Sequence, residues 1–255
     1  MEFLRGAGRI AMAHRGFTAF KVPMNSMAAF REAANLGLRY IETDVRGTRD
    51  GVAVILHDRM LRPTWGVSGA IDQLNWSSVR RADLGGGESI PTLEELLATF
   101  PDMRINIDIK AEPAIEPTVD VIERLNAHNR VLVTSFSDRR RRRALRLLSK
   151  PVATSAGTGA FVGCLAAKTP ASRAYAWRVL RDSDCLQLPP RLGRVRVISP
   201  GLVRAAHASG RQVHAWTVDD PEVMHMLLDM GVDGIITDRS DLLRDVLIAR
   251  NEWWA

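Results

Sequence analysis

Eight short apolar runs, separated by stretches of helical periodicity, restrict most strongly how this chain can fold. The runs are RIAMAH (9–14), RYIETDV (39–45), RINIDIK (104–110), RVLVTSF (130–136), PVATSA (151–156), DCLQLP (184–189), QVHAWTV (212–218) and DGIITD (233–238). Strands that alternate with helices predict a parallel sheet with helical crossovers, and eight such strands can close into a barrel. We therefore expect an α/β fold, a (β/α)8 TIM barrel, with residues 1–255 as a single domain.

The run GVAVILH (51–57) does not fit this alternation. Only about five residues separate it from the second strand, whereas a parallel crossover needs about a dozen or more. It is therefore expected to return antiparallel, as a hairpin that places His57 in the connection after the second strand. Residues 58–92 follow as a loop insertion, which we call the excursion. Since the loops after the strands form the active site of such barrels, we expect the excursion to lie over the site and to set the tail length of the substrate.

Three carboxylates lie near the carboxyl ends of two predicted strands. Glu42 and Asp44 project from one face of the second strand because strand side chains alternate, and Asp108 and Lys110 repeat this spacing on the third. A structural network with Arg or Lys is the alternative interpretation. A cluster of like charges needs a cation, however, and oxygen ligands favour Mg²⁺ or Ca²⁺.

Two histidines and two further cations belong to the same predicted strand ends. His14 and Arg15 end the first strand, and His57 follows the hairpin. A lone histidine is more often a core residue, but two that face an acid cluster fit a general acid–base pair. Arg15 and Lys110 suit the oxygens of a phosphate. Together with a divalent cation, these groups indicate phosphodiester chemistry.

A set of motifs in a fixed order connects these residues with a known protein family. The motifs are HRG (14–16), IETDV (41–45), LHD (56–58), PTLEELL (91–97), NIDIK (106–110), TSF (134–136), AWTV (215–218) and GVDGIITDR (231–239). In this order they resemble the bacterial type of the glycerophosphodiester phosphodiesterase family, over nearly the whole chain. Members of that family are (β/α)8 barrels that use a divalent metal to hydrolyse glycerophosphodiesters to glycerol 3-phosphate and an alcohol.

The resemblance implies a role for each candidate residue. The implied metal ligands are Glu42, Asp44 and Asp108; the acid–base pair is His14 and His57; and the substrate-binding residues are Arg15, Lys110, Phe136 and Trp216. A buried core residue is the alternative for Trp216. The chain also departs from the family pattern at two positions, with Met24 where a Glu is usual and Asp108 where the third ligand is often Glu.

The charge of the chain favours anionic partners. Lys and Arg number 35 against 29 acidic residues, a formal charge of +6. The run SDRRRRRALRLL (137–148) predicts a helix capped by Ser137 or Asp138, and its arginines are either a solvated face or a site that draws anionic lipid headgroups. We therefore consider two alternatives beside hydrolysis of small diesters: a lysophospholipid phosphodiesterase at a membrane surface, and a catalytically weakened phosphate-binding barrel. No nucleic-acid partner is expected, because no aromatic residues interleave with the run.

The sequence also bears on the compartment. The two cysteines, Cys164 and Cys185, have no metal-type spacing, and no run approaches eighteen apolar residues. The first residues lack the apolar core of a signal peptide. A cytoplasmic protein without a disulfide framework is the expectation.

Overall fold

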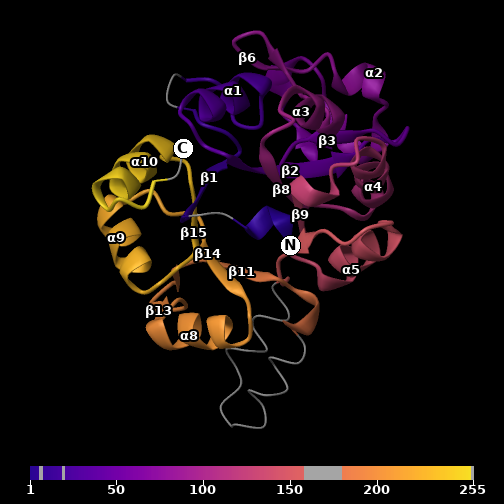
Figure 1. Cartoon of the computed structure of the whole chain (residues 1–255). Coiled ribbons are helices and arrows are strands. Elements are labelled where there is room, and N and C mark those ends of the chain that lie inside the picture. The colour runs from indigo at the N-terminus through magenta and orange to yellow at the C-terminus, as the bar shows by residue number, and fades with distance from the viewer. Residues whose placement is uncertain (6–7, 19–20, 158–179, 254–255) are drawn as a thin grey trace.

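Eight parallel strands curve into a barrel at the centre of the computed structural model, which describes residues 1–5, 8–18, 21–157 and 180–253 (Figure 1). The strands are β1 (Ile10–His14), β2 (Tyr40–Gly47), β8 (Arg104–Ile109), β9 (Val131–Thr134), β10 (Ala153–Thr154), β11 (Cys185–Leu188), β14 (Gln212–Ala215) and β15 (Gly234–Thr237). They pair in the order β10-β9-β8-β2-β1-β15-β14-β11, and a parallel bridge from Ser155 to Cys185 joins the two ends. Each predicted run coincides with one strand, and β2 continues past its run to Gly47, which confirms the predicted barrel.

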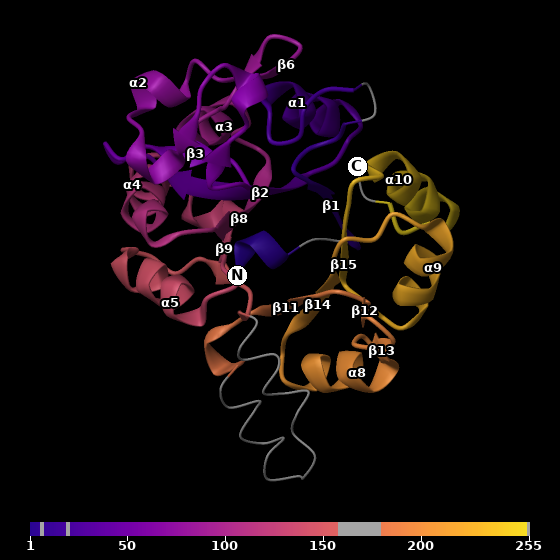
Figure 2. The same ribbon diagram turned by 180° about the vertical axis from the view of Figure 1, so that it is seen from behind.

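Helices surround the barrel, and Figure 2 shows the same ring from behind. They are α1 (Met27–Asn35), α3 (Leu93–Thr99), α4 (Ile115–Arg124), α5 (Asp138–Leu147), α8 (Pro200–Ala208), α9 (Pro221–Asp229) and α10 (Ser240–Ala249). Side-chain caps stabilise the first turns of the helices: Ser26 caps the start of α1, and Thr92 with Glu95 forms a capping box at the start of α3. The buried faces of the helices pack on the outward side chains of the strands, such as Ile41, Ile105 and Ile235.

The amino-terminal end of the barrel is filled by side chains. The short helix η1 (Glu2–Leu4) brings Phe3 against Tyr40, with ring centroids 5.3 Å apart and nearly perpendicular planes. The guanidinium of Arg104 lies over the Tyr40 ring and donates to the carbonyl of Phe3 at 3.2 Å. Met12 and Ile236 continue this apolar floor inside the barrel. Side chains therefore close the barrel at this end, and Gln212 adds a hydrogen bond from its side-chain amide to the carbonyl of Leu4 at 3.1 Å.

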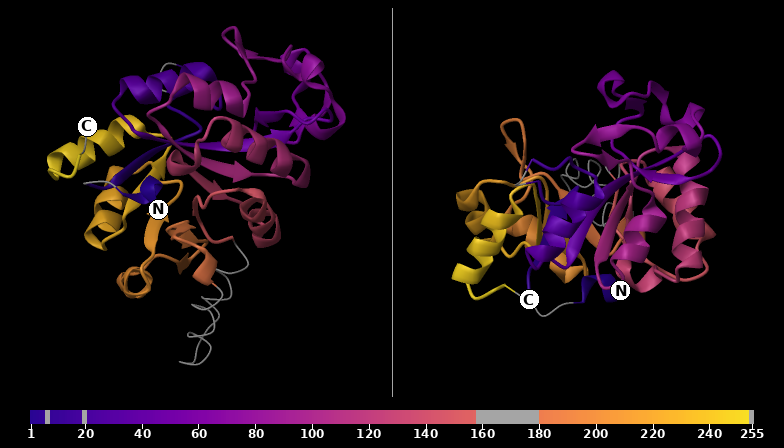
Figure 3. Two further views of the ribbon diagram at one scale, coloured as in Figure 1. Left: turned by 45° about the vertical axis from the view of Figure 1, so that its right-hand side comes forward. Right: turned by 90° about the horizontal axis from the view of Figure 1, so that it is seen from above.

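The hairpin after β2 forms as expected. β3 (Ala53–Ile55) pairs antiparallel with β2, with Ile55 opposite Val45. The chain then continues through β4 (Met60–Leu61), η2 (Pro63–Trp65), β5 (Gly69–Ala70), η3 (Ile71–Gln73), α2 (Trp76–Val79), β6 (Asp83–Gly85) and β7 (Glu88–Ser89). These elements enclose a small apolar core of their own, which includes Leu61, Ile71 and Val79. Figure 3 shows this part rising from one side of the barrel, at the end away from both termini.

The arginine run is exposed in part and buried in part. Ser137 caps α5, accepting a hydrogen bond from the amide of Arg140. Arg141 is fully buried, with its guanidinium 3.1 Å from Asp138 and 3.0 Å from Asp182, which lies in η6 (Leu180–Asp182). Arg142 pairs with Asp182, and Arg143 with Glu112 and Glu116. The solvated face therefore describes the exposed Arg139 but not Arg141, whose partner Asp182 lies on another element that the local pattern of α5 does not show.

Two further expectations concern the cysteines and the membrane. Cys185 is buried in the barrel with a free thiol, whereas Cys164 lies outside the described residues. Burial raises the pKa of the Cys185 thiol, so it is uncharged. In the described part of the chain no helix has both the length and the apolar character needed to cross a bilayer.

Candidate active site

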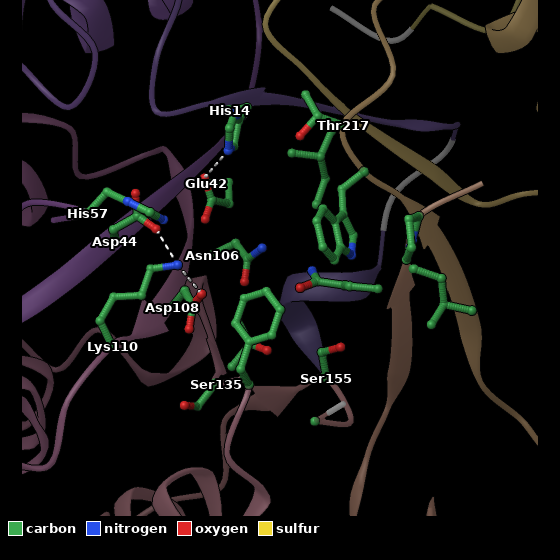
Figure 4. A pocket seen from close by; sticks show the side chains of 18 of the residues that line it. His14, Glu42, Asp44, His57, Asn106, Asp108, Lys110, Ser135, Ser155 and Thr217 are labelled. Atoms are coloured by element: carbon green, nitrogen blue, oxygen red, sulfur yellow. Dashed lines mark hydrogen bonds and ion pairs between the residues drawn. The ribbon is translucent and has the colours of Figure 1, made fainter. Parts of the chain in front are cut away.

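A pocket of about 340 Å³ opens at the carboxyl ends of the strands, and all nine site residues proposed from the sequence line it (Figure 4). These are His14, Arg15, Glu42, Asp44, His57, Asp108, Lys110, Phe136 and Trp216. The labelled acids and both histidines lie toward one side of the pocket with Lys110. The fold therefore brings the proposed residues together, while their roles remain a proposal.

The register of three strands explains why these side chains meet. His14 on β1 lies opposite Glu42 on β2, and β2 and β8 align Glu42 with Asn106 and Asp44 with Asp108. Residues at equal height on neighbouring parallel strands point to the same face. Two carboxylates spaced two apart on β2 thus face the side chains of β8 directly.

The turn after β1 directs Arg15 into the same cluster. Arg15 has φ of 57° and Gly16 has φ of 87°, both in the left-handed region. The amide of Arg15 donates to the carbonyl of Glu42, and the amide of Asn25 donates to the carbonyl of Arg15, each at 2.9 Å. A Cβ on Gly16 would lie 2.7 Å from the Cβ of Ala29, so the close approach of α1 requires glycine here.

Asp44 is the carboxylate with the most cationic contacts. Its two oxygens lie 2.7 Å from the ammonium of Lys110 and 2.8 Å from the Nε of Arg15. Burial alone would raise the pKa of Asp44, but the charges of Lys110 and Arg15 outweigh it and hold that pKa below its ordinary value. Lys110 also lies 2.6 Å from Asp108, whose pKa is nevertheless raised by burial. Asp44 is therefore ionised in this arrangement.

Glu42 is a buried acid without a close cation. Burial and the neighbouring charge of Asp44 raise its pKa to about 8. Its Oε2 atom has no hydrogen-bond partner and lies 3.8 Å from Nε2 of His14. The ionised form of Glu42 therefore lacks a neighbouring positive charge that would stabilise it.

The donor set fits a hard divalent cation. The Oδ1 atoms of Asn106 and Asp108 also lack hydrogen-bond partners, so three buried oxygens are unsatisfied beside Asp44. Oxygen-only sites suit Mg²⁺ and Ca²⁺. Within the described ranges, however, no three His, Cys, Asp or Glu side chains already stand in a coordinating arrangement. The ammonium of Lys110 lies 2.7 Å from Asp44 and 2.6 Å from Asp108. The chemistry of the residues thus fits the group, with Lys110 neutralising part of the cluster.

Both histidines have a carboxylate on Nδ1. His14 lies 2.7 Å from Asp238, which follows β15, and His57 lies 2.8 Å from Asp58. Burial lowers the pKa of His14, but the hydrogen bond to Asp238 and the charge of Glu42 outweigh it, so that pKa is raised. A carboxylate on Nδ1 leaves Nε2 as the atom that exchanges a proton.

An apolar wall completes the pocket. The rings of Phe136 and Trp216 meet edge to face with centroids 5.8 Å apart, and the Lys110 ammonium lies 5.3 Å from the Phe136 centroid. Leu192, from the hairpin of β12 (Arg191–Leu192) and β13 (Val195–Arg196), adds to this lining. Trp216 also packs on the barrel floor cluster, so the core and pocket interpretations are compatible.

The excursion does not line the pocket. None of residues 58–92 is among the lining residues in the part of the chain that the structure describes. The expectation that it sets the length of the substrate is therefore not supported. Phe136 and Leu192 form the wall instead, both 54% exposed.

Three residues with contacts in the site were not proposed from the sequence. Asn25 donates to Asp44 at 3.0 Å and accepts from Thr43 at 2.8 Å, which fixes one carboxylate oxygen. Asn106 lines the pocket, and Asp238 orients His14. Asn106 could have been found from the sequence, because side chains alternate along a strand and a residue two positions before Asp108 shares its face. Met24, the departure from the family pattern, is 41% exposed and is not among the lining residues.

The comparisons with known proteins agree with this geometry. Residues 14–242 match the model of the glycerophosphoryl diester phosphodiesterase family. A Mycobacterium tuberculosis protein named "Probable glycerophosphodiester phosphodiesterase 2" is 73% identical over 99% of this chain and 96% of its own length. A glycerophosphodiester phosphodiesterase of Caldanaerobacter subterraneus is 30% identical over 92% of this chain and 96% of its own.

Among solved structures, the fold is similar to that of a phosphodiesterase from Oleispira antarctica, whose structure is a complex with the product sn-glycerol-3-phosphate. The TM-score is 0.77 at 22% identity, covering 94% of this chain and 97% of that one. This likeness concerns the barrel alone, whereas the family match extends over most of the sequence. The chain belongs to the glycerophosphoryl diester phosphodiesterase family.

Proposed function

We propose that this chain hydrolyses glycerophosphodiesters to glycerol 3-phosphate and an alcohol, with a divalent cation, Mg²⁺ or Ca²⁺, and two histidines. The observation that carries the proposal is the convergence of His14, His57 and three buried carboxylates on one pocket. The names of the two sequence relatives and the product bound in the Oleispira structure support the substrate class.

Glu42, Asp44 and Asp108 would hold the cation. When bound, it would neutralise charge that develops on the phosphoryl oxygens. The three unsatisfied oxygens and the shortage of positive charge at Glu42 support this assignment. Asn25 would keep Asp44 in place through its hydrogen bond at 3.0 Å.

Arg15 and Lys110 would bind the phosphate. Both cations already lie within 2.8 Å of Asp44, so they are positioned beside the carboxylates that would hold the ion. One histidine would take the proton of the nucleophile, either water or the neighbouring glycerol hydroxyl, and the other would protonate the leaving alkoxide. The ring of Phe136 and the indole of Trp216 would line the glycerol or alcohol portion of the substrate.

The test is hydrolysis of glycerophosphocholine by the purified protein with Mg²⁺, with Ca²⁺ and with a chelator. We expect activity that the chelator abolishes and either cation restores. His14→Ala and Asp44→Asn should each lower kcat by about 100-fold or more. Asp72→Asn, a carboxylate outside the pocket that pairs with Arg59, and His207→Ala, a partly exposed histidine, are the matched controls. Full activity in the presence of chelator would contradict the metal assignment.

A second substrate class is favoured by the apolar wall. Phe136 and Leu192 remain half exposed at the pocket, which suits the acyl chain of a lysophospholipid. Comparing kcat/KM for lysophosphatidylcholine and glycerophosphocholine distinguishes hydrolysis of lysophospholipids from hydrolysis of small diesters. A kcat/KM for the lipid equal to or greater than that for glycerophosphocholine would favour the lipid phosphodiesterase. If the protein binds the cation and phosphate tightly but hydrolyses neither lysophosphatidylcholine nor glycerophosphocholine, it is a phosphate-binding barrel.

A further inference from the structure

The β12–β13 hairpin exposes an apolar pair. Leu192 lies directly opposite Val195 in the antiparallel register, and these side chains are 54% and 64% exposed. Single exposed aliphatic side chains are common on protein surfaces. Two that face each other across a short hairpin form a small apolar ridge, and such ridges indicate a surface that meets another phase or partner.

Three arginines surround this ridge. Arg191 lies opposite Arg196 in the hairpin register, and Arg194 lies in the turn, where its carbonyl accepts a hydrogen bond from Arg191 at 3.1 Å. All three side chains are exposed, and none has a carboxylate partner in the described part of the chain. The arginines of α5 are different, since Arg141 and Arg143 are paired with acids. The hairpin therefore carries three uncompensated positive charges beside two exposed aliphatic side chains.

The hairpin stands at the mouth of the pocket. Leu192 lines the pocket, and Phe136, which is also 54% exposed, lines it too. Viewed from above, the orange loop of the hairpin projects from the carboxyl end of the barrel, on the side opposite the excursion (Figure 3). A flat surface that touched the hairpin would thus lie across the entrance to the site.

We propose that the β12–β13 hairpin docks this protein on an anionic phospholipid bilayer. Leu192 and Val195 enter the interface between headgroups and acyl chains, while Arg191, Arg194 and Arg196 contact lipid phosphates. Arginine suits this position because its apolar stem lies along the interface and its planar guanidinium matches phosphate oxygens. The combination of exposed aliphatic side chains and unpaired cations is that of an interfacial anchor. A nucleic acid would use the arginines but would leave the aliphatic pair in water.

Docking is a property of the surface and does not require turnover. Its test therefore measures binding of the full chain to vesicles of phosphatidylcholine, with and without phosphatidylglycerol, by co-sedimentation. We expect binding only to the anionic vesicles, weakened by added salt. The variant Arg191→Gln/Arg194→Gln/Arg196→Gln should lower the partition coefficient on the order of 100-fold, since each cation near an anionic bilayer contributes about fivefold. Val195→Ser should lower it about tenfold by removing apolar contact.

Two matched variants control for charge and apolarity in general. Arg5→Gln/Arg31→Gln/Arg204→Gln removes the same charge from exposed positions outside the hairpin, and Ile248→Ser removes a side chain that is 51% exposed on α10. Both should bind vesicles as the unmodified chain does. Hydrolysis of the water-soluble glycerophosphocholine should be unchanged in the hairpin variants, because neither Val195 nor the three arginines line the pocket. Circular dichroism confirms that each variant is folded.

Four outcomes would overturn the proposal. They are no binding to anionic vesicles, equal binding to pure phosphatidylcholine, binding unaffected by either hairpin variant, and an equal loss in the control variant that removes charge elsewhere. A nucleic-acid interface would be indicated if a duplex RNA bound in a way that the hairpin arginines control and Val195→Ser does not change, with no vesicle binding. If the protein shows vesicle binding but no diester hydrolysis, docking stands and the proposed function fails.

Discussion

Nδ1 of His14 lies 2.7 Å from Oδ1 of Asp238, and this contact joins the carboxyl ends of the neighbouring strands β1 and β15. With Asp238 as acceptor, the proton of a neutral imidazole resides on Nδ1, and Nε2 faces Glu42 at 3.8 Å. The amide of Asp238 is held in turn by Asp219 at 2.8 Å. The orientation of one candidate proton carrier is thus fixed by a residue 224 positions away.

Replacing Asp238 tests this positioning role. In Asp238→Asn the hydrogen bond and the negative charge that raise the pKa of His14 are both weakened, so that pKa should fall. We expect kcat to drop about tenfold or more, with the limb of the pH–rate profile that belongs to His14 displaced to lower pH. The profile is measured with glycerophosphocholine, beside Asp241→Asn, which only loses a surface pair with Arg239. An unchanged profile would mean that Asp238 does not act through His14.

The raised pKa of Glu42 predicts that cation binding releases a proton. The ordinary pKa of the side chain is 4.5, and burial and Asp44 raise it to about 8 in the absence of a cation. Between these values Glu42 is protonated in the folded protein, and an ion that binds it must displace that proton. Affinity for Mg²⁺ or Ca²⁺ should therefore increase with pH up to about 8. Calorimetry at pH 6.5 in buffers of different ionisation enthalpy measures the release, which should be absent in Glu42→Gln.

Gly16 and Gly86 are a matched pair for backbone strain. Both have positive φ, 87° and 68°, but a Cβ on Gly16 would lie within 2.9 Å of three atoms of Ala29, whereas Gly86 has nothing within 4 Å. Gly86→Ala should cost about 1 kcal/mol of unfolding free energy from φ alone. Gly16→Ala should cost roughly 3 kcal/mol or more, because α1 must also move. Urea unfolding compares them, and equal losses would show that the contact with α1 does not matter.

Arg141 and Arg139 are a matched pair within the arginine run. Arg141 is fully buried and faces Asp138 and Asp182, so Arg141→Met leaves two carboxylates without that partner and should cost roughly 3 kcal/mol. Arg139 is exposed and has no ion pair among the residues described, so Arg139→Met should change stability by about 0.5 kcal/mol or less. Thermal unfolding measures both. A similar loss in the two variants would restore the interpretation of the whole run as a solvated face.

Much of the fold and the lining of the site followed from local patterns. The eight apolar runs and the cap of α5 at Ser137 can be read from short stretches of sequence. The acids of β2 and β8 lie at equal height because the two parallel strands are in register. Asp238 and Asn25 could not be found in this way. Their roles depend on which strand closes against β1 and on a left-handed turn at φ of 58°, and neither is visible in spacing.

The burial of Arg141 within the arginine run could not be predicted for the same reason. Its helix and cap were predicted correctly, but Asp182 approaches from a segment 41 residues later and converts a candidate surface group into a buried ion pair. The exposed hairpin at Leu192 and Val195 was missed for the opposite reason. Its alternation is too short to distinguish a buried strand from a projecting loop.

The closed amino-terminal end of the barrel has a consequence for substrate entry and product release. The amino-terminal end of the barrel is closed by Phe3, Tyr40 and Arg104. In the described structure the pocket therefore opens only at the carboxyl end. Under the proposed reaction, both fragments must leave by the route through which the intact diester arrived. A fragment that stays bound therefore occupies space that the next diester needs, so the product competes with the substrate for the pocket.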